Sequence, residues 1–149
     1  MTILGSLDGI AAGLRNMRRS RPLETIRVEV APGQFVTAPT AEESLRVKAY
    51  LVVQRNQVRD YLDVVALSDH IGRDAAVGVL QRIDEYYDDR SLLNGSVLTS
   101  LALSLAAPSP RDVDVIDELP RYRALDPRWH DWSDVVAACH ALALGLANL

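Results

Sequence analysis

From residue 39 to the end of the chain, apolar residues recur every three or four positions, which is the period of an amphipathic helix. Asn56 and Gly72 mark helix boundaries, and Pro108 and Pro110 interrupt the pattern. The segment 92–106 is almost wholly apolar, so we expect it at the centre of the core. The pattern predicts helices over residues 41–55, 57–71, 74–87, 92–106, 111–118 and 134–147.

The N-terminal part of the chain has a mixed pattern. Apolar residues between Leu7 and Met17 are spaced as on one face of a helix, which predicts a helix over residues 6–19. Further on, Ile26 to Val30 alternate with charged residues, as in a half-buried strand. A Pro-Gly pair then precedes a second short strand, so we expect a β-hairpin over residues 25–38.

A helix-start signal joins these two parts. In the spacing of Thr40 and Glu43, the Thr40 hydroxyl accepts from the Glu43 N–H and the Glu43 carboxylate accepts from the Thr40 N–H, which is a capping box. We predict a single domain over residues 1–149, with a helix and a hairpin in residues 1–38 and a helical domain in residues 39–149. The predicted fold class is mainly α, a bundle of about five to six helices with a small N-terminal β-hairpin.

The amino-acid composition agrees with such a domain and indicates in which cellular compartment it lies. Apolar residues make up 48% of the chain and aromatic residues 5%, so aliphatic side chains must build the core. Cys139 is the only cysteine, which excludes an internal disulfide and favours a reducing compartment. We see neither a signal peptide nor a run of about 20 apolar residues. We therefore expect a cytoplasmic protein with no membrane partner.

The net charge of −4 argues against general attraction to nucleic acid, but the charges are unevenly distributed. Residues 15–28 contain one acidic residue, Glu24, and five arginines: Arg15, Arg18, Arg19, Arg21 and Arg27. These arginines either form a solvated helix end or contact a phosphate backbone. The second possibility makes a small nucleic-acid-binding regulator one hypothesis for function.

The densest polar pattern falls on the first two predicted helices, which a tight connection should hold antiparallel. Lys48 on one helix and Asp63 on the other can then approach each other, with Asp60 three residues before Asp63. A lysine beside two carboxylates, with Arg55 and Arg59 nearby, is a place to hold a triphosphate and orient an attacking hydroxyl. The structural alternative is a set of ion pairs, between Lys48 and Asp63 or between Arg59 and Asp60.

This polar pattern resembles a known family. The runs Ala38-Pro-Thr-Ala-Glu-Glu-Ser-Leu-Arg-Val-Lys-Ala and Gln54-Arg-Asn-Gln-Val-Arg-Asp-Tyr-Leu-Asp-Val are similar to AbiEii/AbiGii-type nucleotidyltransferases. These are toxin components of bacterial toxin–antitoxin and abortive-infection systems, and they include the MenT type. In that family, a lysine and an aspartate of the two helices complete the nucleotide site. The resemblance assigns these roles to Lys48 and Asp63, with Asp60 as the second choice, and it covers roughly residues 25–149.

The resemblance implies transfer of a nucleotide from an NTP, with Mg²⁺, to an acceptor such as the tRNA 3′ end, in a toxin with a cognate antitoxin. Lys48 would grip the triphosphate, Asp63 would orient the site, and Arg55 and Arg59 would contact phosphate. The family also needs an Asp-x-Asp pair for metal after an N-terminal Gly-Ser turn, and no such pair follows Gly5-Ser6. The alternative is a catalytically inactive, truncated remnant that acts as a protein-interaction module.

Overall fold

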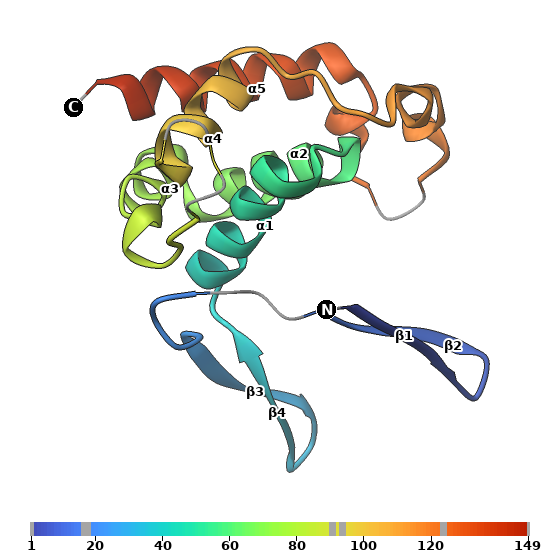
Figure 1. Ribbon diagram of the computed structural model, residues 1–149. Helices are drawn as coiled ribbons and strands as arrows, with labels where there is room; N and C mark the ends of the chain where they lie inside the picture. Colours follow the sequence, from blue (N-terminus) through green and yellow to red (C-terminus); the bar gives the residue numbers. More distant parts are fainter. Residues whose placement is uncertain (1, 16–18, 90–91, 93–94, 123–124, 149) are drawn as a thin grey trace.

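The computed structural model describes residues 2–15, 19–89, 92, 95–122 and 125–148 (Figure 1). It is mainly helical, which confirms the predicted fold class, and two β-hairpins extend from the helical body near the N-terminus. The α-helices are α1 (Ala41–Arg55), α2 (Val58–Ile71), α3 (Arg73–Leu80), α4 (Val97–Ala106) and α5 (Trp132–Ala147). The 3₁₀ segments are η1 (Ile83–Glu85), η2 (Val113–Arg121) and η3 (Pro127–Trp129). The strands are β1 (Thr2–Leu7), β2 (Ile10–Arg15), β3 (Thr25–Ala31) and β4 (Gln34–Pro39).

One hydrophobic core holds the helical body together. Helix α1 packs against α2, α3 and α4, and α5 packs against α2, α3 and α4. Leu45 of α1, Val64 of α2, Leu101 of α4 and Cys139 of α5 are each fully buried in this core. Aliphatic side chains thus supply most of the buried surface, as the composition predicted, and their burial drives the packing of the helices.

The start of α1 follows the prediction only in part. The Thr40 hydroxyl accepts from the Glu43 N–H at 3.1 Å, as expected for an N-cap. The reciprocal half of the capping box is absent, because the Thr40 N–H donates to the Glu24 carbonyl at 3.1 Å. The Glu43 carboxylate instead pairs with the arginines Arg19 and Arg46. A tertiary ion-pair network has therefore replaced a local hydrogen bond.

The predicted boundaries of the later helices differ from the observed ones at several caps. Asn56 ends α1 in the left-handed conformation, at φ 53° and ψ 56°, and Gln57 rather than Asn56 caps α2. Helix α4 begins at Val97, later than predicted, because the Asp84 carboxylate accepts from the N–H groups of Val97 and Leu98 at 2.7 and 3.0 Å. The Ser96 hydroxyl caps the same helix end locally by accepting from the Thr99 N–H at 3.0 Å, and Asp84, 13 residues before Val97, adds to this cap.

The helix predicted over residues 6–19 is wrong where the structure describes it. Strands β1 and β2 form an antiparallel hairpin there, and residues 16–18 lie outside the described part. Asp8 and Gly9 connect the strands with φ values of 51° and 80°, as in a type I′ turn. An Asp-Gly pair between two apolar runs signals such a hairpin, and glycines disfavour a helix, so these two signals outweigh the apolar spacing.

The hairpin predicted over residues 25–38 is confirmed. Strand β3 pairs antiparallel with β4, with Val28 opposite Val36 and Glu29 opposite Phe35. Gly33, in the turn, has a φ of 73°. Every residue of β3 from Thr25 to Val30 is exposed, so the helical body covers neither face of this strand. Among the described residues, no helix is both long and apolar enough to cross a lipid bilayer.

Candidate functional site

The site predicted from sequence centres on Lys48, whose Nζ lies 2.6 Å from Oδ2 of Asp63. The tight connection at Asn56 brings α1 and α2 together, which produces the predicted contact. The two side chains are 28% and 33% exposed, so the pair sits at the edge of the helix interface and is partly screened by water. This geometry corresponds to the structural alternative, an interhelical ion pair.

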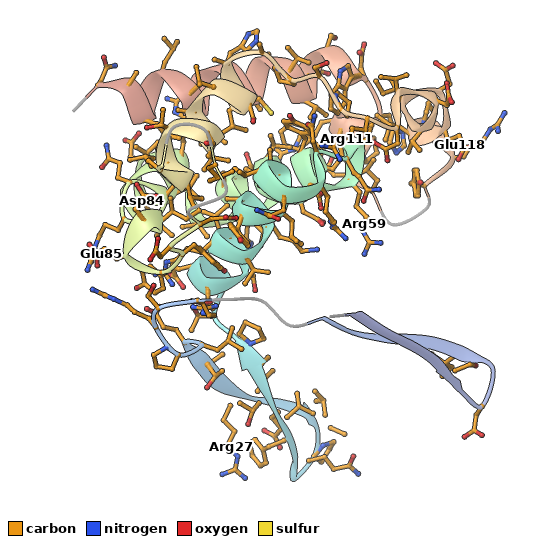
Figure 2. All side chains as sticks on the ribbon, in the orientation of Figure 1. Arg27, Arg59, Asp84, Glu85, Arg111 and Glu118 are labelled. Carbon is orange, nitrogen blue, oxygen red and sulfur yellow. The ribbon has the colours of Figure 1, made fainter. Side chains whose placement is uncertain are left out.

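Asp60 and the two predicted arginines are placed differently from one another. Asp60 is fully buried, and its carboxylate pairs with Arg55 and also accepts from the Gln57 N–H at 3.4 Å. The alternative pairing of Arg59 with Asp60 is therefore wrong, since Arg55 takes that place. Arg59 is exposed and projects from α2 at the rim of the helical body (Figure 2). Asp60 thus stabilises the start of α2, where a negative charge is favourable.

A groove runs along α2 beside this cluster. Two cavities of about 390 and 430 Å³ share Leu62, Asp63 and Leu125 in their walls. Arg59 lines the first cavity, and Arg128 lines the second, where it pairs with Asp69. The groove therefore carries charges of both signs, with three aspartates beside its two arginines, and no excess of positive charge that would attract a triphosphate.

The described residues hold no group of three His, Cys, Asp or Glu side chains close enough to bind a metal ion. The family resemblance alone predicts binding of Mg²⁺, an NTP, an antitoxin and tRNA, and these stay predictions. The roles that the resemblance implies for Lys48, Asp60 and Asp63 likewise stay predictions. Each of these three side chains has a structural partner that accounts for its charge.

Arg19 and Arg46 form an ion-pair network that the sequence pattern did not predict. Arg46 of α1 donates to Glu24 at 2.9 Å and to Glu43 at 2.8 Å, and its guanidinium lies 4.1 Å from the centre of the Tyr86 ring. Arg19 pairs with the same fully buried Glu43. The network ties the segment before β3 to α1 and η1, and it anchors the hairpin to the helical body. The spacing of Glu43 and Arg46 at i and i+3 was visible in the sequence, but their distant partners were not.

Hydrogen bonding also tunes the pKa of a carboxyl in this network. The Tyr86 hydroxyl donates to Glu24 at 2.6 Å, and this bond, followed by the bond from Arg46, lowers the pKa of Glu24 below its ordinary value.

The other N-terminal arginines that the structure describes also have partners. Arg21 pairs with Glu85 at 2.6 Å, and the Arg27 guanidinium lies over the Phe35 ring at 4.2 Å. Arg19, Arg21 and Arg27 thus have partners within the chain, while the side chains of Arg15 and Arg18 lie outside the described part.

A second groove, between α4 and α5, was also missed. It has a volume of about 590 Å³, and no charged side chain lines it. Leu103 and Leu144 on its walls are 60% and 67% exposed, although the sequence predicted that the whole segment 92–106 would be central. His140 is the one ionisable residue among those that line it: Leu98, Thr99, Ala102, Leu103, Ala106, His140, Ala143, Leu144, Leu146 and Ala147. Only one face of α4 lies in the core.

Comparison with known proteins gives a different relationship from the one that the sequence motifs implied. The chain is 33% identical over 129 residues to "Heme uptake protein MmpL11" of Mycobacterium tuberculosis. It is 32% identical over 130 residues to "Mycolic acid-containing lipids exporter MmpL11" of Mycolicibacterium smegmatis and 29% identical over 137 residues to "Probable transport protein MmpL11" of Mycobacterium leprae. These matches cover 87–88% of this chain, which itself spans only 12–13% of the length of each relative. No family model and no solved structure matches the chain.

These relatives are transport proteins, so the resemblance to AbiEii/AbiGii-type nucleotidyltransferases is wrong. The toxin–antitoxin role, the nucleotide transfer and the interpretation of the fold as the C-terminal portion of such an enzyme fall with it. The error has a physical cause. The two motifs are a short pair of charged amphipathic helices, and unrelated helical proteins place lysine and aspartate at such spacings to form ion pairs. The MmpL11 similarity instead extends over most of the chain.

Proposed function

We propose that this chain is a helical domain of an MmpL11-type transport protein and that it acts by binding other proteins rather than by catalysis. The observation that carries the proposal is the similarity to MmpL11 proteins over 129 residues at 33% identity. The charges support a role without chemistry, because Lys48, Asp63, Asp60 and Arg55 are paired with one another. Apolar side chains left exposed on β3 and α4 supply surface for contacts.

The proposal is tested by exchange of the matched segment. In a mycobacterial strain without its own MmpL11, the matching segment of the Mycobacterium tuberculosis relative is replaced by this chain, and growth on heme as the iron source is measured. We expect the chimera to restore growth and a version with the segment deleted to fail. A chimera that carries Leu101→Asp, which places a charge in the core, is the control for a folded domain.

A second variant of the chimera separates binding from catalysis. The double change Lys48→Met with Asp63→Leu removes both charges of a half-exposed pair, so the fold should be retained. We expect this chimera to restore growth as well as the unaltered one. Loss of growth in a chimera that is produced at normal levels would mean that the pair has a chemical role, and it would overturn the non-catalytic part of the proposal.

We place the domain on the cytoplasmic side of the membrane. The single cysteine, Cys139, is buried with a free thiol, which suits a reducing compartment. The test uses Glu118→Cys, at an exposed position of η2, in the full-length chimera with Cys139→Ala. Whole cells should protect the new thiol from a membrane-impermeant maleimide, and permeabilised cells should not. Labelling in intact cells would place the domain on the other side.

The apolar groove between α4 and α5 favours a second candidate function, the binding of an apolar cargo molecule. Two relatives are named for heme and for mycolic acid-containing lipids, which are both large and mainly apolar. The groove volume of about 590 Å³ lies in the usual range for small-molecule sites, and His140 offers an imidazole to a heme iron. Titration with hemin should then give a Soret shift that His140→Ala removes. A shift unchanged by this variant and by Leu103→Asp would exclude the groove.

A further inference from the structure

The outer edge of β3 is an unused pairing surface. Within the described residues, β3 and β4 form a sheet of only two strands, and β3 pairs with β4 alone. An isolated two-stranded hairpin is marginally stable in water, and further strands normally complete it. The hairpin stands away from the helical body, so its edge is open to another chain (Figure 1). An open edge rich in β-branched residues favours strand addition.

Aliphatic residues of this hairpin gather on one face, and Phe35 lies on the other. Side chains alternate between faces along a strand, so Ile26 and Val28 share a face, and a β-bulge between Glu29 and Ala31 interrupts the alternation at Val30. Val36 lies opposite Val28 on the same face. The side chains of Ile26, Val28, Val30 and Val36 are 53%, 39%, 59% and 45% exposed in that order. The helical body does not cover this face, which is therefore available to a partner.

The sequence of β3 is self-complementary when two copies run antiparallel. We propose that β3 pairs with β3 of a second copy of this chain, centred on Val28, to form a continuous four-stranded sheet. In this register, Val28 faces Val28 of the second copy, and Ile26 lies beside Val30 at the β-bulge, where the regular pairing ends. Arg27 of each copy then faces Glu29 of the other, which gives two opposite-charge pairs across the twofold axis.

Charge selects this register over its neighbours. A shift that leaves the apolar face in place moves the pairing by two residues. One such shift sets Arg27 opposite Arg27, and the other sets Glu29 opposite Glu29; like charges directly opposite each other destabilise a sheet. A parallel arrangement in register likewise sets arginine beside arginine. The edge of β4, from Gln34 to Ala38, has no charged residue and so offers no comparable selection.

Both charged side chains keep bonding capacity for this contact. Glu29 accepts from the Gly33 N–H at 2.8 Å through Oε1, and its second carboxylate oxygen can accept from an arginine. The Arg27 guanidinium carbon lies 4.2 Å from the centre of the Phe35 ring, and a guanidinium has five N–H donors, which is more than this contact uses. Arg27 projects from the hairpin on the side away from the helices (Figure 2). The proposed pairing therefore adds contacts without removing those inside the hairpin.

Charge reversal in the 149-residue chain tests the pairing. Arg27→Glu sets two glutamates opposite two glutamates, and Glu29→Arg sets two arginines opposite two arginines. We expect each variant to raise the dimer dissociation constant at least about tenfold, as measured by sedimentation equilibrium, because both cross-strand pairs become repulsive. Carrying both changes in one chain restores opposite charges in the same register, so this double variant should dimerise like the unaltered chain.

A mixture gives an independent version of the same test. Chains with Arg27→Glu and chains with Glu29→Arg repel their own kind, but they complement each other and should form a heterodimer. Glu118→Arg, at an exposed position on η2, is the control for net charge and should leave dimerisation unchanged. Circular dichroism confirms that each variant is folded. A monomeric unaltered chain at the highest concentration tested would overturn the proposal, as would single reversals without effect.

Cross-linking tests the register directly. Val28→Cys brings two thiols opposite each other on the twofold axis, within reach of a disulfide. Val36→Cys is the matched control on the same face, since β4 strands are separated by about 14 Å across a four-stranded sheet. We expect mild oxidation to give a cross-linked dimer with Val28→Cys alone. Equal cross-linking at both positions would mean that two copies pack through their apolar faces instead of pairing at the edge of β3. No cross-linking at either position would mean that the hairpin of a monomer binds a different protein, and it would overturn the proposal.

Discussion

The helical body and the β3–β4 hairpin contain the same kinds of apolar residue in opposite environments. In the helices, Leu45, Val64 and Leu101 are fully buried, whereas Ile26 and Val30 of the hairpin are more than half exposed. Both patterns are amphipathic by period. The helices meet other helices of the same chain, and the hairpin meets none of them across its faces. A periodic pattern therefore identifies an apolar face that will be buried against another surface. The pattern does not show whether that surface belongs to the same chain or to another one.

The charge network at the base of the hairpin joins the two regions, and its loss should have the largest effect. Glu43→Ala leaves Arg46 and Arg19, which are 9% and 12% exposed, without their shared carboxylate. Removing one partner of a buried ion pair costs about 3–5 kcal/mol. We therefore expect the free energy of unfolding in urea to fall by about 4 kcal/mol.

The matched control is the half-exposed pair of α1 and α2. Replacing Lys48 by Met and Asp63 by Leu together should change stability by less than about 1 kcal/mol, because water partly screens this partly buried pair. Equal losses in the two variants would show that burial does not distinguish these networks.

A truncation in each region sharpens the contrast in packing. Leu101→Ala removes a fully buried side chain at the centre of the core, so we expect a loss of about 3 kcal/mol in the free energy of unfolding. Val28→Ala, at a position 39% exposed, should cost less than about 1 kcal/mol in the monomer. Urea unfolding at low protein concentration measures both. A large loss at Val28 in the monomer would mean that the hairpin is an integral part of the core.

Replacing either of two glycines of the helical body by alanine should change the free energy of unfolding, in opposite directions at the two positions. A Cβ at Gly145 of α5 would lie 2.7 Å from Cγ2 of Val77, so Gly145→Ala should destabilise the body by about 2 kcal/mol. Gly78→Ala meets nothing within 4 Å and should stabilise α3 by about 0.5–1 kcal/mol. Thermal unfolding compares the two variants. A shift of the same sign in both would mean that α3 and α5 do not approach as closely as described.

The smallest expected effect is on acid stability at the junction. Because the pKa of Glu24 is lowered in the folded state, its contribution to stability is present above the ordinary glutamate pKa and is lost as the pH falls through the folded value. Tyr86→Phe removes the hydroxyl donor and lets this pKa rise. The midpoint of acid unfolding should then shift to slightly higher pH, as followed by circular dichroism. The same shift in a Glu24→Gln background would assign the effect to another group.

Local patterns predicted much of the fold. The apolar period and the signals at Thr40 and Gly72 placed α1 and α2 within a few residues, and alternation with a Pro-Gly turn placed the β3–β4 hairpin. The helix predicted over residues 6–19 is wrong because the glycines of this segment disfavour a helix in spite of its apolar spacing. The contact between Lys48 and Asp63 was predictable as well, since a short connection between two helices favours their antiparallel packing.

Such patterns did not predict the function, because the two short charged motifs that resemble a nucleotide site form ion pairs. By itself, the sequence determined the mainly helical class and most of the helices, since helix period, caps and turns depend on neighbouring residues. Only the tertiary structure decided that Arg46 joins Glu24 and Glu43, that Asp84 adds to the cap of α4, and that one face of α4 and the edge of β3 stay open. Those contacts join residues far apart in the chain, and a linear pattern carries no record of which distant groups will meet.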